Sequence, residues 1–186
     1  MKLGLEGRRA LVCGSSSGLG RAIALELARE GTRVVICSRS RDRIEAAREE
    51  MIHELSGDAE VAGDPAGRIH AAVADLSTPA GRGGVVEAAV GAFGGIDILV
   101  TNTGGPPSGP MEAHDLATWR TAYEGLLESV VELNGLVLPA MKAQGWGRIV
   151  NVTSISVKQP VEGLILSNTL RAGVTGFART VANEVA

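Results

Sequence analysis

A glycine-rich loop lies between the first apolar run of the chain and the first amphipathic stretch, and it constrains the fold more than any other feature. Gly14 permits a tight exit from a strand, Gly18 lets a phosphate group approach the backbone, and Gly20 lets a helix pack closely on a sheet. The amide groups and positive dipole at the start of that helix favour an anion. Glycine spacing alone also fits an ordinary turn, but the flanking strand and helix favour phosphate binding. The predicted phosphate loop comprises Gly14, Ser15, Ser16, Ser17, Gly18, Leu19 and Gly20.

Beyond this loop, short β-branched runs alternate with longer helical stretches along the whole chain. Strands are predicted at residues 9–13, 33–37, 68–74, 96–101 and 148–152, and helices at 19–30, 41–55, 79–93, 115–144 and from 166 onward. The run at 96–101 is almost wholly apolar, which is typical of a parallel strand that is buried on both faces. The alternation therefore predicts an α/β fold, a doubly wound parallel sheet with helices on both faces.

Length and composition fit one such domain over residues 1–186. The chain is 45% hydrophobic and 21% charged, which is enough apolar material for one core. Its net charge of −3 gives no electrostatic reason to expect nucleic acid. The N-terminus lacks a basic segment followed by an apolar one, and no apolar run is long enough to cross a bilayer. We therefore expect a cytoplasmic protein without a membrane partner.

Two further expectations concern the cysteines and the end of the chain. Cys13 and Cys37 both end predicted strands, and in a reducing compartment they are expected to be buried thiols without a disulfide. No metal site is expected. The helical pattern continues to Ala186 without a glycine cap or a proline. A doubly wound sheet usually continues with another strand, so the sequence suggests that a C-terminal part is absent.

The end of the second predicted strand distinguishes between the two nicotinamide dinucleotides. NAD-binding domains commonly carry an acidic residue there, which holds the ribose hydroxyls. This chain has Ser38 and Arg39 instead. A guanidinium can pair with the 2′-phosphate of NADP and stack on adenine, and a serine hydroxyl can donate beside it. The pair therefore favours NADP over NAD, although Arg39 also fits a solvated start to a basic helix.

The chain resembles the short-chain dehydrogenase/reductase family, in the branch that includes the β-ketoacyl carrier-protein reductases, because it carries several of the family's motifs in the family's order. Besides the glycine loop, Asp75 and Leu76 match the family's adenine-contacting pair. Residues 101–104 are similar to its Asn-Asn-Ala-Gly stretch, so Asn102, Thr103 and Gly104 are expected at the cofactor. Residues 147–154 match the strand that leads to the catalytic serine. The resemblance implies a Rossmann fold, an NADP-dependent oxidoreductase and a homo-oligomer, a dimer or tetramer formed through the two last helices.

The predicted active site departs from this family. The family tetrad is Asn, Ser, Tyr and Lys, and only the serine is matched, by Ser154. The family's interval places Ser167 and Arg171 at the Tyr and Lys positions, and Leu126 at that of Asn. Residues i and i+4 share a helix face, so Ser167 and Arg171 are both expected to face the nicotinamide. Arg171 is also expected to bind the cofactor, because its guanidinium can hydrogen-bond the ribose hydroxyls.

These departures leave two hypotheses open. In the first, the chain is an oxidoreductase that acts on a carbonyl or alcohol, with catalytic residues Ser154, Ser167 and Arg171 and with protons supplied through water. An aliphatic hydroxyl is a much weaker acid than tyrosine, so Ser167 is a poor general acid. In the second hypothesis, the chain is a non-catalytic NADP-binding or regulatory protein on the same fold. Other candidate proton donors, such as Tyr123, are not ranked as catalytic.

Overall fold

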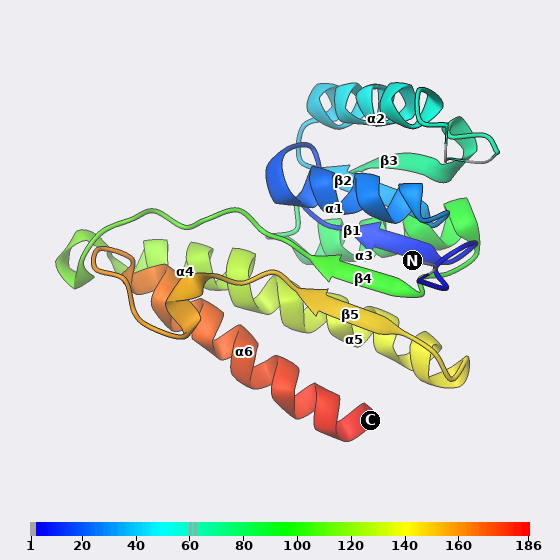
Figure 1. Cartoon of the computed structure of the whole chain (residues 1–186). Helices are drawn as coiled ribbons and strands as arrows, with labels where there is room; N and C mark the ends of the chain where they lie inside the picture. Colours follow the sequence, from blue (N-terminus) through cyan, green and yellow to red (C-terminus); the bar gives the residue numbers. More distant parts are fainter. Residues whose placement is uncertain (1–2, 60, 62) are drawn as a thin grey trace.

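The computed structural model describes residues 3–59, 61 and 63–186, and its centre is a parallel sheet with the strand order β3-β2-β1-β4-β5 (Figure 1). The strands are β1 (Arg9–Val12), β2 (Arg33–Ser38), β3 (Ile69–Val73), β4 (Ile98–Thr101) and β5 (Arg148–Asn151). The helices are α1 (Gly18–Arg29), α2 (Arg41–Ser56), α3 (Pro79–Phe93), α4 (Leu116–Tyr123), α5 (Ser129–Ala143) and α6 (Ile165–Val185). Every predicted strand is present, with its limits moved by at most a few residues.

The sheet separates two apolar layers, because successive side chains of a strand point to opposite faces. Ala10 and Val12 of β1 pack in the cluster that includes residues of α1 and α2. Leu11 and Cys13 pack in the other cluster, with residues of α3 and α5. The fold is therefore the predicted doubly wound α/β arrangement, with helices on both faces. None of the described helices is long and apolar enough to cross a membrane.

The long helix predicted over residues 115–144 is present, but it contains a local irregularity. Helices α4 and α5 are joined without a loop by the π-helical turn η3 (Glu124–Glu128). The hydroxyl of Ser129 donates to the carbonyl of Gly125 at 2.8 Å, next to this wider turn. Single π-turns are frequent at functional sites, and this one contains Leu126. Hydrophobic periodicity cannot reveal such a turn, because the apolar face continues through it.

A buried arginine links helix α3 and the segment after β3 to η3 and α5. Arg82 of α3 is fully buried, and its guanidinium donates to Glu132 of α5 at 2.5 Å and to Glu128 of η3 at 3.1 Å. It also donates to the backbone carbonyl of Leu76 at 3.1 Å. The segment after β3 is therefore held to the helix that follows β4.

The two cysteines lie side by side behind the carboxyl ends of β1 and β2. Both are fully buried and neither forms a disulfide, as predicted. A hydrogen bond between the thiols is the main cause that raises the pKa of Cys13 well above its usual value, and burial adds to this. Cys37 also borders the cavity described next.

Candidate functional site

A cavity of about 1090 Å³ opens at the carboxyl ends of β1 to β4. In an open α/β sheet, ligands bind at this edge, where the strand order reverses. Here the reversal lies between β1 and β4, which both neighbour the glycine loop. The cavity brings together these predicted cofactor residues: Gly14, Ser16, Ser17, Ser38, Arg39, Asp75, Leu76, Asn102, Thr103 and Gly104.

Two glycines of the loop, Gly14 and Gly20, are packed so tightly against Asn102 that neither position has space for a side chain. Gly14 has a φ of +56°, and a Cβ there would lie 2.4 Å from the Asn102 carbonyl oxygen. A Cβ on Gly20 would lie 2.4 Å from the Gly14 carbonyl oxygen. The side-chain amide of Asn102 donates to that same carbonyl at 3.0 Å. Asn102 therefore fixes the shape of the loop, and both glycines are required by close approach.

The start of α1 offers donors toward the cavity. Ser17 precedes the helix with extended backbone, and its side chain makes no capping hydrogen bond to the first turn. The first amides of an α-helix have no partner within the helix, so an anion can accept from them. Gly18 has a φ of +58° and faces open space, and Leu19 is 68% exposed. These features fit a phosphate group at the helix start.

Ser15 differs from its neighbours, because its polar groups bond within the fold. Its hydroxyl donates to the Val12 carbonyl at 2.7 Å and accepts from the Cys37 amide at 2.9 Å. Its own amide donates to the Cys37 carbonyl at 3.0 Å. The side chain is fully buried, so Ser15 joins β1 to β2 and supports the loop from behind.

Positive charge collects at the end of β2. Arg39 and Arg43 both line the cavity, together with Ser38 and Ser40. Ser40 caps α2 by accepting from the Arg43 amide, and this places Arg43 in the first turn of the helix. Arg43 was not among the predicted cofactor residues. The spacing from Ser40 to Arg43 is that of a helix cap and its third residue, which could have indicated it.

The end of β3 completes this side of the cavity. The carboxylate of Asp75 accepts from the amide and the hydroxyl of Ser77, at 3.0 and 2.8 Å. These bonds are the main cause that lowers the pKa of Asp75, and the charge of Arg39 contributes. Asp75 is therefore an anion near Arg39. Gly81 of α3 allows the close approach of this segment, since a Cβ there would lie 2.0 Å from the Asp75 carbonyl oxygen.

The three predicted catalytic residues lie after β5 and on α6, outside the cavity lining. The hydroxyl of Ser154 accepts from the Ser156 amide at 3.2 Å. Ser167 is 7% exposed. The guanidinium of Arg171 donates to the carbonyls of Val152, Thr153 and Gly104, at 3.2, 3.4 and 3.2 Å. Burial lowers the pKa of Arg171.

Arg171 therefore bridges the carboxyl ends of β4 and β5 through backbone carbonyls. Leu126 does line the cavity, and it belongs to an apolar cluster with Ala122, Leu166 and Leu170 between α4, η3 and α6. Tyr123 is 46% exposed, and Tyr123 does not line the cavity. An apolar wall thus stands where the resemblance would put a polar group.

Comparison with known proteins identifies the family. The model of the short chain dehydrogenase family matches residues 8–186. The chain belongs to this family. A 3-oxoacyl-[acyl-carrier-protein] reductase from Aquifex aeolicus is 31% identical over 186 residues, covering 100% of this chain and 71% of the relative. A D-beta-hydroxybutyrate dehydrogenase from Rhizobium meliloti is 32% identical over 183 residues, covering 96% and 66%.

Solved structures agree with the family assignment. The crystal structure of L-sorbose reductase from Gluconobacter frateurii, complexed with NADPH and L-sorbose, superposes with a TM-score of 0.89 at 32% identity. The match covers 100% of this chain and 66% of that one. This member of the short-chain dehydrogenase family thus spans about two thirds of the length of the solved reductase.

Proposed function

We propose that the cavity binds NADP(H). The observation that carries this proposal is the meeting of the glycine loop with Arg39 and Arg43 at one cavity. Two guanidinium groups at the end of β2 match the 2′-phosphate, and the start of α1 matches the pyrophosphate. The NADPH bound by the L-sorbose reductase supports the same choice.

Affinity for the two dinucleotides tests the proposal. We expect NADP to bind at least tenfold more tightly than NAD, and the double variant Ser38→Asp/Arg39→Leu to reverse this order. Arg41, the first residue of α2, lies two positions after Arg39 but does not line the cavity, so Arg41→Leu is the matched control and keeps the preference for NADP. Equal affinities of the wild-type protein for NADP and NAD, measured by calorimetry, would refute the assignment.

We further propose that the chain is an oxidoreductase acting on a carbonyl or alcohol substrate. The nicotinamide supplies or accepts the hydride when the cofactor is bound. Ser154 would hydrogen-bond the substrate oxygen, Ser167 would assist it, and the charge of Arg171 would stabilise negative charge that develops nearby. Neither serine hydroxyl is acidic enough to act as the tyrosine of the family does, so water would supply the proton.

A panel of ketones and β-ketoacyl thioesters with NADPH tests this reaction. We expect slow but saturable NADPH oxidation, with kcat lowered at least tenfold by Ser154→Ala and with cofactor affinity unchanged. Thr169→Ala alters an exposed residue of the same helix as Ser167 and serves as the control. Absence of turnover with every substrate, in a protein that binds NADPH, would contradict the proposal.

A second function is favoured by the contacts of Arg171. Its guanidinium already bonds to three carbonyls, and Leu126 offers no hydrogen bond, so the chain could bind NADP(H) without reacting. Tight NADPH binding without turnover would support this candidate. It would be abandoned if Ser154→Ala/Ser167→Ala removed the biological effect of the protein while fold and cofactor affinity stayed intact.

We also propose that the chain forms a homo-oligomer through α5 and α6. Val131 and Leu136 of α5 are apolar, yet they are 41% and 42% exposed, while another face of the helix is buried through Val130, Leu133 and Val137. Light scattering during size-exclusion chromatography measures the mass, and a monomer at micromolar concentration would contradict this interface.

A further inference from the structure

A second, smaller hollow lies at the amino ends of β1 and β2, at the edge of the sheet opposite to the cofactor cavity. Its volume is about 380 Å³, and its lining includes Arg8, Arg9, Arg33 and Trp146. Arg9 and Arg33 are the first residues of their strands, and Arg8 precedes β1. We call this hollow the amino-end pocket.

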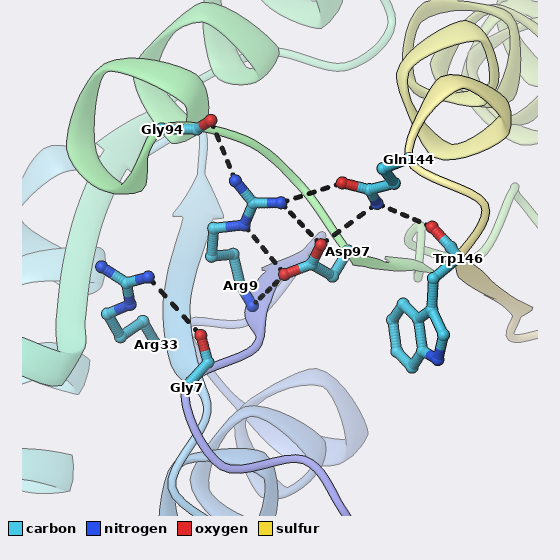
Figure 2. Close-up of polar contacts among 7 residues, drawn as sticks. All are labelled: Gly7, Arg9, Arg33, Gly94, Asp97, Gln144 and Trp146. Carbon is cyan, nitrogen blue, oxygen red and sulfur yellow. Dashed lines mark hydrogen bonds and ion pairs between the residues drawn. The ribbon is translucent and has the colours of Figure 1, made fainter.

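Arg9 forms a fixed and neutralised part of the pocket (Figure 2). Two nitrogens of its guanidinium donate to the two carboxylate oxygens of Asp97, at 2.8 and 2.6 Å. The same side chain donates to the Gly94 carbonyl at 2.9 Å and to Gln144 at 3.1 Å. Because of these contacts, the charges of Arg9 and Asp97 neutralise each other, and the pair forms a fixed floor of the pocket.

Arg8 and Arg33 are held in another way, against aromatic rings. The Cζ atom of Arg8 lies 3.8 Å from the centroid of Trp146, and that of Arg33 lies 5.5 Å from the centroid of Phe93. Neither arginine forms an ion pair with any described residue. Within the described part of the chain, Arg33 donates one long side-chain hydrogen bond, to the Gly7 carbonyl at 3.5 Å. Stacking uses the face of a guanidinium and leaves the N–H donors at its edge free.

The charge balance of the amino-end pocket is positive. Besides Asp97, which Arg9 neutralises, Glu6 is the carboxylate in the lining, and its single negative charge is outnumbered by the two positive charges of Arg8 and Arg33. Arg148 also stacks near the Trp146 ring, with its Cζ 4.8 Å from the centroid, but it lines another hollow and is not counted here. The protein as a whole carries a net charge of −3, so this positive pocket is not a consequence of the overall composition.

We propose that the amino-end pocket binds a small phosphorylated ligand, independently of the cofactor cavity. A phosphate group has enough oxygens to accept from two guanidinium edges at once, and such charge-assisted bonds are the strong ones. The pocket volume suits a small metabolite and is too small for a dinucleotide. Because the aromatic rings already orient Arg8 and Arg33, little side-chain freedom is lost on binding.

Tryptophan fluorescence and calorimetry with inorganic pyrophosphate test the proposal. The chain has two tryptophans, so Trp119→Phe leaves Trp146 as the only reporter, directly under Arg8. We expect saturable quenching or enhancement of Trp146 at submillimolar pyrophosphate. In Arg8→Gln/Arg33→Gln the Kd should rise at least tenfold. Arg8→Lys/Arg33→Lys keeps the charges and should recover part of the affinity.

Three controls separate this pocket from the cofactor cavity and from other anions. Gly20→Ala, which disturbs the loop proposed to hold the pyrophosphate of NADP, should change the Kd reported by Trp146 less than twofold, and Arg8→Gln/Arg33→Gln should leave NADP affinity unchanged. Unaltered pyrophosphate affinity in Arg8→Gln/Arg33→Gln, with a native melting curve, would overturn the proposal. So would loss of the Trp146 response in a folded Gly20→Ala variant, or succinate binding more tightly than pyrophosphate. A failure to bind NADP would leave the outcomes measured with pyrophosphate and succinate unaffected.

Discussion

The two ends of the candidate site are built in different ways. At the β1 to β3 end, contacts of Gly14 and Gly20 with Asn102 leave no space for a side chain, and Arg39 and Arg43 face the cavity. At the β4 to β5 end, an apolar cluster and the carbonyl contacts of Arg171 occupy the corresponding positions. Binding a dinucleotide depends mainly on backbone shape, whereas reacting with it depends on particular side chains. A chain can therefore keep its dinucleotide-binding loop while the residues that react with the cofactor change.

Removing the link between the two ends should have the largest effect. Arg82→Met leaves Glu128 and Glu132 without their cation and the Leu76 carbonyl without its donor. Glu128 and Glu132 are 37% and 35% exposed, so water solvates them in part, and losing the hydrogen bonds of the buried guanidinium should cost about 3 kcal/mol. We expect a loss of this size in the free energy of urea unfolding. Glu132→Gln, which keeps one hydrogen-bonding oxygen, is the milder control, and equal stability of the Arg82→Met variant and wild type would contradict the linking role.

The second largest loss of stability is expected from a change in the glycine loop, at the β1 to β3 end of the site. In Gly20→Ala the new Cβ meets the Gly14 carbonyl at 2.4 Å, so the loop must move away from Asn102. Overpacking of this kind costs about 2–3 kcal/mol, and we expect NADP affinity to fall at least tenfold. Gly83→Ala is the matched control, because nothing lies within 4 Å of its Cβ in α3. The free energy of unfolding of Gly83→Ala should rise by roughly 0.5–1 kcal/mol, because alanine loses less conformational entropy in a helix than glycine. Normal NADP affinity in Gly20→Ala would show that the tight loop is not needed.

A change at the second end should affect stability more than binding. Arg171→Met removes the donors to the Val152, Thr153 and Gly104 carbonyls and should cost about 2 kcal/mol. We expect the Kd for NADP to change less than threefold. Arg171→Lys cannot span all three carbonyls and should recover only part of the stability. A tenfold loss of NADP affinity in a stable Arg171→Met protein would instead place the guanidinium at the ribose.

The smallest effect concerns the amino ends of the strands and depends on pH. The hydrogen bond from Arg9 is the main cause that lowers the pKa of Asp97, so the folded state favours its ionised form. The corresponding stability is present above the unfolded pKa of about 3.9 and is lost as pH falls through the lower, folded value. Asp97→Asn should cost about 1 kcal/mol at pH 7, and the difference from wild type should shrink toward pH 3. A difference that stayed constant with pH would exclude this pair as the source.

The sequence predicted the parts of the site that depend on backbone shape. The glycine spacing, the ends of the predicted strands and the Asn102 segment each predicted a cofactor-binding loop, and the structure places residues of all of them around one cavity. Side-chain partners were harder to predict. Ser15 and Ser17 are alike in sequence, yet one bonds inside the fold and the other faces the cavity, because the turn points them in opposite directions.

The burial of Arg82 and the partners of Arg171 had no sequence signal. Arg82 lies in a predicted helix like any surface arginine, and its partners are supplied by another helix 46 and 50 positions away. Arg171 was expected to face the nicotinamide from its i+4 spacing to Ser167. Periodicity gives the helix face, but it cannot show that three backbone carbonyls lie within reach of the guanidinium.

The paired thiols of Cys13 and Cys37 offer an internal reporter of motion at the cavity. Neither sulfur has exposed surface, so an alkylating reagent can reach them only when β1 and β2 separate locally from the glycine loop. The rate of alkylation therefore measures how often this wall opens. A ligand that rests on the loop would hold the wall shut, and slower modification would report its presence without any catalytic turnover.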